Sequence, residues 1–148
     1  MKTLNQNSTA IFCCLMEMMN GNEHLNINNE PFMPLTIEKI GEDIITPMGV
    51  CCAYSLCHYY EQQGDLVQDP EMCFLIWFDR TEHTEELTKV TIAPFMFQHG
   101  NLGIYQESIE FSNQIMGKIH TEMQADHAEF ADIWLDNIKL QGFLKSGQ

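Results

Sequence analysis

The sequence predicts an α+β fold: an antiparallel sheet of four or five strands, with N-terminal and C-terminal helices packed on one face. Apolar residues near both ends of the chain recur with the spacing of amphipathic helices. Through the middle of the chain they alternate with a period of two, and turn-forming residues separate the alternating segments. This pattern is typical of antiparallel strands that helices cover on one side.

The first helix is expected to start at a cap on Ser8 or Thr9 and to end near Met19. Its apolar residues have the spacing of one buried stripe. They are Ile11, Phe12, Leu15, Met16 and Met19. Residues 22–34 contain four Asn and two Pro, so we predict a connecting loop there.

Strand patterns occupy the middle of the chain. Residues 35–40 alternate with a period of two and predict a strand that ends at Gly41. Residues 50–62 form the longest strand candidate, with even-numbered side chains on one face and odd-numbered side chains on the other. The turn-forming residues 63–71 predict an acidic hairpin loop, and residues 72–78 predict the second arm of that hairpin.

Beyond this hairpin, the chain continues with a charged turn and another strand. The turn is expected at residues 79–86 and the strand at residues 87–98. Pro94 lies within that strand, which predicts an edge position or a bulge because proline donates no ladder hydrogen bond. Residues 100–103 are then expected to turn the chain into residues 104–107.

The last third of the chain is predicted to be helical. One helix is expected from Ser112 to Met123, weakened by a central glycine. A final helix starts near Asp126 and Glu129, which form a capping-box-like pair. Its expected buried stripe is Phe130, Ile133, Trp134 and Ile138. Gly142 fits the position after the helix end, and Phe143 is expected to fold back onto it.

The charge of the chain limits its partners. Twenty-one Asp and Glu residues oppose seven Lys and Arg residues, which gives a formal net charge of −14. Such a surface repels phosphate backbones, so we expect no direct binding of nucleic acid. The basic residues are scattered along the sequence and form no stripe. The charge leaves three alternatives open: a basic protein partner, a cation, or no partner.

The cysteines and the apolar segments indicate the compartment. All six cysteines lie in apolar surroundings and no CxxC motif is present, so we expect free thiols that behave as small apolar side chains. The apolar run at residues 10–16 is too short for a signal peptide, and no segment has the length that spans a bilayer. We therefore expect a cytoplasmic protein with a single domain, residues 1–148, and no membrane segment.

Three blocks of the sequence resemble a known family. They are HYYEQQGDLVQDPEM at residues 58–72, LGIYQE at residues 102–107 and FADIWLDNIKLQGF at residues 130–143. The family is a domain of unknown function from uncharacterised bacterial proteins, found on plasmids and conjugative elements. The resemblance implies an accessory gene on mobile DNA. It assigns no activity, no cofactor and no catalytic residue.

Candidate binding residues cluster around the predicted acidic hairpin. His58 lies on the strand, and Asp65, Asp69 and Glu71 lie on the expected loop. Carboxylates at such spacings are able to surround a hard cation, with the histidine as a further ligand or a general base. The same residues also suit turns, in which Asp side chains cap the backbone.

Two amides complete the set of candidate ligand-binding residues. Gln62 and Gln106 lie beside apolar positions, where an amide contributes to a small-molecule site or satisfies a strand edge. The motifs GxSxG, GxGxxG and GxxxxGK[ST] are absent, and HExxH is absent as well. We therefore assign no catalytic residue.

Two classes of function remain open. The first is a small acidic, non-enzymatic interaction protein that binds a basic protein. In its narrower form, the acidic surface imitates nucleic acid toward the basic groove of a host DNA-binding protein. The second is a domain that binds a metal or a small ligand through His58, Asp65, Asp69 and Glu71. The sequence does not indicate an oligomeric state.

Overall fold

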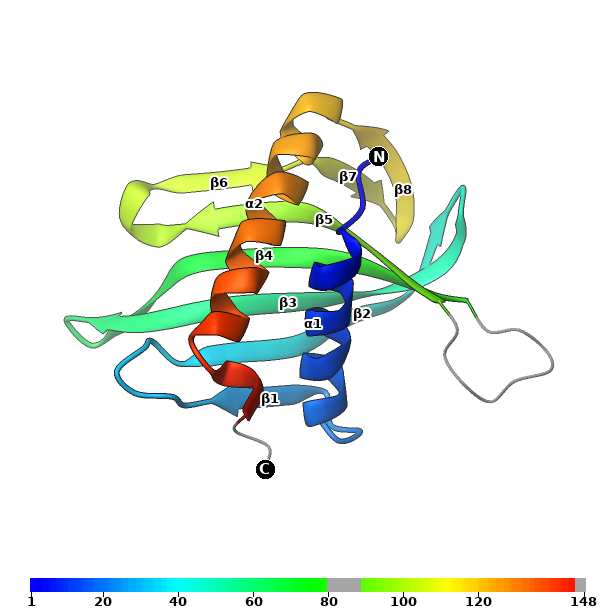
Figure 1. Cartoon of the computed structure of the whole chain (residues 1–148). Coiled ribbons are helices and arrows are strands. Elements are labelled where there is room, and N and C mark those ends of the chain that lie inside the picture. The colour runs from blue at the N-terminus through cyan, green and yellow to red at the C-terminus, as the bar shows by residue number, and fades with distance from the viewer. Residues whose placement is uncertain (80–88, 146–148) are drawn as a thin grey trace.

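A computed structural model describes residues 1–79 and 89–145. One helix precedes the strands in the sequence and a second helix follows them (Figure 1). The elements are, in order, α1 (Gln6–Met18), β1 (His24–Ile27), β2 (Leu35–Thr46), β3 (Gly49–Gln62), β4 (Asp65–Asp79), β5 (Lys89–His99), the 3-10 turn η1 (Gly100–Leu102), β6 (Ile104–Glu107), β7 (Ile109–Ser112), β8 (Ile115–Ile119), α2 (Thr121–Leu140) and the 3-10 turn η2 (Phe143–Lys145). The predicted α+β class is confirmed. The predicted charged turn at residues 79–86 lies mostly outside the described residues.

The eight strands of the described part form one mostly antiparallel sheet. Its order is β6-β5-β4-β3-β2-β8-β7, and β1 pairs with the first half of β2. The contact between β2 and β8 is parallel. The prediction of four or five strands was too low because β1, β7 and β8 have only four or five residues each. A loop was expected at β1 and a helix at β8, and most of β7 lies in residues that were assigned to no element.

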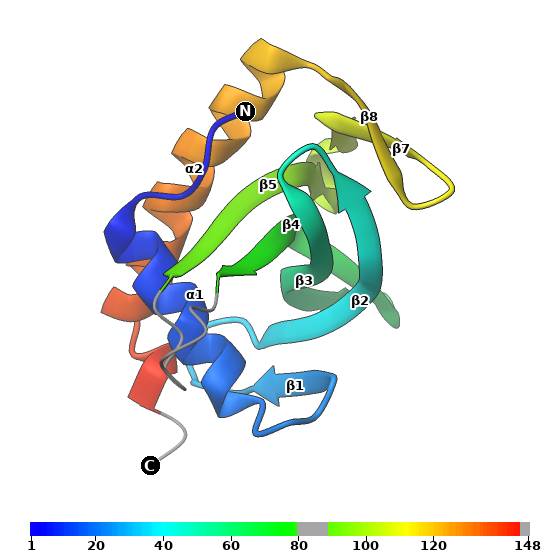
Figure 2. The same ribbon diagram turned by 90° about the vertical axis from the view of Figure 1, so that its right-hand side faces the viewer.

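The sheet curls strongly on itself. β6 pairs with β5, and after Ser108 the chain continues as β7, which pairs with β8. β8 in turn contacts the far end of β2. Strands β7 and β8 therefore form an arch over one face of the central strands, as Figure 2 shows. Helices α1 and α2 cover the opposite face. That both helices lie on one face agrees with the prediction.

Each face of the sheet has its own apolar cluster. Phe12 of α1 and Trp134 of α2 pack on Leu56 and Phe74 between the helices and the sheet. On the other face, a smaller cluster lies beneath the arch. It contains Ile44, Cys51, Ala53, Leu75, Trp77, Ala93 and Ile109. The predicted alternation in β3 is confirmed, because its even-numbered side chains face the helices and its odd-numbered side chains face the arch.

Helix α1 has the predicted buried stripe but a different cap. Asn5 precedes the helix with extended backbone, and its side-chain oxygen accepts a hydrogen bond from Ser8 N at 2.7 Å. Ser8 itself is buried, and Thr9 Oγ1 donates to the carbonyl oxygen of Asn5. The helix therefore starts earlier than predicted, because an asparagine rather than a hydroxyl satisfies its first free N–H groups.

Strands β2 and β4 are longer than predicted. β2 continues through Gly41 to Thr46, with register shifts on both sides of the glycine. β4 begins at Asp65, so the predicted acidic loop is largely strand. Pro70 is accommodated there because the pairing with β3 has a bulge at this point. In β5 the bulge predicted at Pro94 is confirmed, although β5 is an inner strand between β4 and β6.

The prediction was wrong for the helix at Ser112–Met123. This segment starts at the last residue of β7 and contains the β7–β8 turn, all of β8 and the first residues of α2. Both residues of the turn, Asn113 and Gln114, have positive φ (51° and 66°). α2 begins at Thr121, ahead of the predicted start near Asp126.

The predicted stripe of the last helix is only partly correct. Trp134 and Ile138 are buried, whereas Phe130 and Ile133 are exposed. The helix ends as predicted, with Gly142 at a φ of +88° and Phe143 fully buried. No helix within residues 1–79 and 89–145 combines the length and the apolar character needed to cross a membrane.

Candidate functional site

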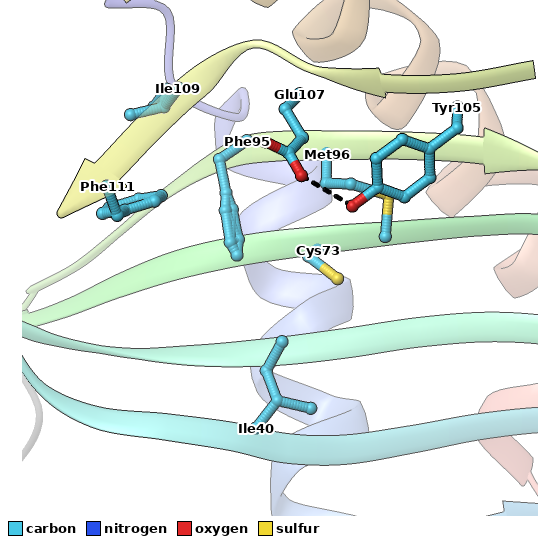
Figure 3. Close-up of a pocket in the computed structure, with 8 residues that line it drawn as sticks. All are labelled: Ile40, Cys73, Phe95, Met96, Tyr105, Glu107, Ile109 and Phe111. Carbon is cyan, nitrogen blue, oxygen red and sulfur yellow. Dashed lines mark hydrogen bonds between the residues drawn. The ribbon is translucent and has the colours of Figure 1, made fainter. Parts of the chain in front are cut away.

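Two adjoining hollows form a groove on the sheet face opposite the helices, and Figure 3 shows the side chains that line the larger one. Their volumes are about 380 Å³ and about 260 Å³. Ile40, Phe95 and Phe111 line both hollows and so join them. The larger hollow is also lined by Cys73, Met96, Tyr105, Glu107 and Ile109. A groove at the mouth of a curled sheet is a common location for ligand sites.

The strand register explains why these side chains meet. Tyr105, Gln98, Glu71 and Cys57 are successive partners across β6, β5, β4 and β3, so they form one row on the groove face. A second row on the same face lies two residues further along each strand from the first row. It consists of Glu107, Met96, Cys73 and Ser55. Tyr105 and Glu107 line one end of the larger hollow, and the other polar side chains of the two rows border it on the same face. We call this region the polar end.

The Glu71 carboxylate is fixed by two side-chain hydrogen bonds, one to each of its oxygens. Its Oε2 accepts a hydrogen bond from Ser55 Oγ at 2.5 Å, and its Oε1 accepts one from Gln98 Nε2. The Glu71 side chain is half-buried. Nearby, Tyr105 donates its hydroxyl hydrogen to Glu107 Oε1 at 2.7 Å (Figure 3). The polar end thus contains two carboxylates, each oriented by neutral donors.

The titratable groups around Glu71 stay neutral at physiological pH. Burial raises the pKa of the Cys57 thiol to about 12, and the Glu71 charge adds to the increase. The same two causes raise the pKa of Cys73. The hydrogen bond to Glu107, followed by burial and nearby negative charge, raises the pKa of Tyr105 to about 12. Neither thiol is therefore activated as a nucleophile, since the reactive form is the thiolate.

The other end of the groove is apolar. The rings of Phe95 and Phe111 meet edge to face, with centroids 5.2 Å apart. Ile40 beside them is 48% exposed, and Phe111 is 36% exposed, so apolar surface is open to solvent. No Lys or Arg of the described residues lines either hollow. Lys39, which precedes Ile40, pairs with Glu42 at 3.7 Å.

The structure separates the residues of the predicted hairpin site. His58 faces the helices, where its Nδ1 lies 3.1 Å from the carbonyl oxygen of Met33 and its ring packs on Trp134. Burial lowers its pKa, so it stays neutral. Glu71 lies on the opposite face, beside the larger hollow, two residues from its lining residue Cys73. These two predicted ligands are therefore not able to contact one ion.

The remaining predicted residues lie outside the groove as well. Gln62 and Asp65 are exposed partners at the end of the β3–β4 hairpin. Asp69 Oδ1 lies 2.5 Å from His99 Nε2. Gln106 accepts a hydrogen bond from His127 of α2 at 2.9 Å. Within the described part of the chain, no three His, Cys, Asp or Glu side chains are arranged to hold a metal ion.

Sequence reasoning missed most of the groove. Phe95, Tyr105, Glu107 and Phe111 come from β5, β6 and β7, and none of them was a candidate binding residue. Tyr105 and Glu107 do belong to the LGIYQE block, but the resemblance assigned them no role. The one available signal was the alternation in β3 and β4, which places Ser55 and Cys73 on the same face. It did not indicate that β7 and β8 arch over that face.

Together, these features define a small α+β protein with a curled sheet and an open, acidic groove that is partly apolar. The chain belongs to the family described as Domain of unknown function (DUF6908), whose model matches residues 10–144. The resemblance to a family of unknown function is thereby confirmed. Neither the curated proteins nor the solved structures contain a match to this chain.

Proposed function

We propose that this protein is a non-enzymatic interaction protein that binds a basic partner protein in the groove. The occupant is a segment of the partner in which apolar side chains alternate with Lys or Arg. The observation that carries this proposal is the composition of the groove. Exposed apolar side chains lie at one end, Glu107 lines the other end with Glu71 bordering it, and no basic residue of the described part lines either hollow.

Apolar contact and charge favour the same occupant. The exposed side chains of Ile40 and Phe111 gain free energy when an apolar group covers them. Glu71 and Glu107 at the polar end attract a cation, and the net charge of −14 accelerates the encounter with a basic protein. An acidic or purely polar segment lacks one of these contributions.

The proposal also includes the genetic origin, the compartment and the partner of the protein. On the resemblance of its three blocks, the protein serves as an accessory protein of a bacterial mobile genetic element and acts in the cytoplasm. In the narrower form, its partner is a basic host protein whose nucleic-acid groove the acidic surface occupies.

Fluorescence anisotropy with three labelled nine-residue peptides tests the groove. The first peptide alternates Phe and Lys, the second replaces Lys by Glu, and the third replaces Phe by Ser. We expect saturable binding of the first peptide alone. Phe111→Ser is expected to weaken this binding about tenfold, because a buried aromatic contact contributes roughly 1–2 kcal/mol.

Ile133→Ser is the matched control, because Ile133 is exposed on α2 at the other face of the sheet. It should leave the affinity unchanged. Equal binding of the acidic peptide, or an affinity that Phe111→Ser does not alter, would overturn the proposal.

A further inference from the structure

We infer that Glu71 is the anchor of the groove and that it selects an arginine side chain of the partner by a bidentate contact with the guanidinium. This inference rests on the proposed function and names the group that the polar end recognises.

The hydrogen bonds of Glu71 leave room for this contact. A carboxylate accepts about four hydrogen bonds, two at each oxygen. Ser55 Oγ uses one position at Oε2, and Gln98 Nε2 uses one at Oε1. Each oxygen therefore retains one free position. A guanidinium presents two parallel N–H groups with the spacing of two carboxylate oxygens, so it fits this remaining pair.

The charge of Glu71 is not matched by a cation in the described part of the chain. Its two partners, Ser55 and Gln98, are neutral. The adjacent carboxylate of Asp69 already pairs with His99. The Glu71 charge also contributes to the raised pKa values of Cys57, Tyr59, Cys73 and Tyr105, which all remain neutral. A half-buried, oriented carboxylate without a counter-charge is a site for an incoming cation.

The surroundings favour arginine over lysine. Ser55 and Gln98 fix the carboxylate from two neighbouring strands, so both of its oxygens have defined directions. The planar guanidinium of arginine donates one hydrogen bond to each carboxylate oxygen, whereas a lysine ammonium is a point charge that gains little from their fixed directions. Tyr105 lies in the same cross-strand row and offers a ring on which a guanidinium stacks better than an ammonium.

The test compares three versions of the alternating peptide, with Lys, Arg or the uncharged analogue citrulline at the basic positions. Isothermal titration with the wild-type protein should give an Arg peptide that binds about tenfold more tightly than the Lys peptide. Citrulline should weaken binding below the Lys peptide. Glu71→Gln should remove the difference between Arg and Lys, while Glu129→Gln on α2 should keep it.

A second variant tests the inference independently, in case Glu71→Gln does not fold. Gln98→Leu keeps the carboxylate but releases one of its oxygens, so the ratio of Arg to Lys affinity should fall below that of the wild type. If the peptides bind but the wild type does not distinguish Arg from Lys, or Glu71→Gln keeps the difference, this inference is wrong and the proposed function stands. If no basic amphipathic peptide binds, both are wrong.

Discussion

Two histidines are buried on the helix-covered side of the molecule, and their partners fix the position of the ring hydrogen in each. His58 Nδ1 lies 3.1 Å from the carbonyl oxygen of Met33, so this nitrogen carries the hydrogen and donates it. His127 lies between Gln106 Oε1 and Ser108 Oγ, both at 2.9 Å. It joins α2 to the corner where β6 becomes β7. Burial lowers the pKa of both imidazoles.

These lowered pKa values predict a loss of stability in mild acid. Below the ordinary histidine pKa of 6.5 the unfolded chain binds protons at both positions, while the folded protein resists doing so. The free energy of unfolding therefore falls as the pH decreases from about 6.5 through the lower folded pKa values. Urea denaturation at pH 7.5 and pH 5.5 measures this difference.

The double variant His58→Asn and His127→Gln separates this effect from the carboxylates. It removes both titrating rings and retains an amide at each position. The change in its free energy of unfolding between the two pH values should be smaller than that of the wild type. An equal or larger change would show that other groups cause the pH dependence.

At the residue scale, the candidate site was predictable only in part. Glu71 was chosen because acidic residues cluster around the β3–β4 hairpin, and the structure places it on the groove face, beside the larger hollow. His58 was chosen for the same reason, but adjacent residues of a strand point to opposite faces. The alternation in β3 already separated His58 from Ser55 and Cys57. A stricter use of strand parity would therefore have excluded a joint site.

At the scale of single elements, the cap of α1 gives a direct prediction. Asn5→Ala removes the acceptor for Ser8 N, and we expect the free energy of unfolding to decrease by about 1 kcal/mol. Urea denaturation followed by circular dichroism measures this change. Asn5→Asp keeps an acceptor at the helix start and should stay within about 0.5 kcal/mol of the wild type. A full loss in Asn5→Asp would show that the Asn5 amide has another role.

The elements that sequence analysis missed share a physical cause. The apolar residues Ile115, Met116 and Ile119 have a spacing that fits a helix, but five residues form a strand just as well. The turn at Asn113 and Gln114 requires positive φ at both positions, and glycine usually signals such a turn. Long, strongly periodic segments such as β3 and α1 were predicted correctly because their pattern repeats often enough to select one period.

At the scale of the whole molecule, the curl of the sheet depends on contacts between distant segments. β8 meets β2 through the single register pair Ile45 and Ile115, and Ser108 N donates to the carbonyl oxygen of Phe95 at 2.9 Å. No local pattern encodes such contacts, so neither the arch nor the groove beneath it was predictable. The acidic charge, in contrast, is a sum over the chain and needs no structure.

This charge predicts how the fold responds to salt. With a net charge of −14, the folded state brings many carboxylates close together and is destabilised by their repulsion. Raising NaCl from about 0.01 M to about 0.15 M shortens the screening length from about 30 Å to about 8 Å. The free energy of unfolding in urea should therefore increase with salt over this range.

In the part of the chain that the structure describes, Lys39 with Glu42 is the one ion pair of a lysine that salt would weaken. The double variant Glu17→Gln and Glu129→Gln removes two exposed charges from the helices, so its stability should depend less on salt. A wild-type stability that is constant or decreases with salt would show that attraction between local charge pairs outweighs the repulsion.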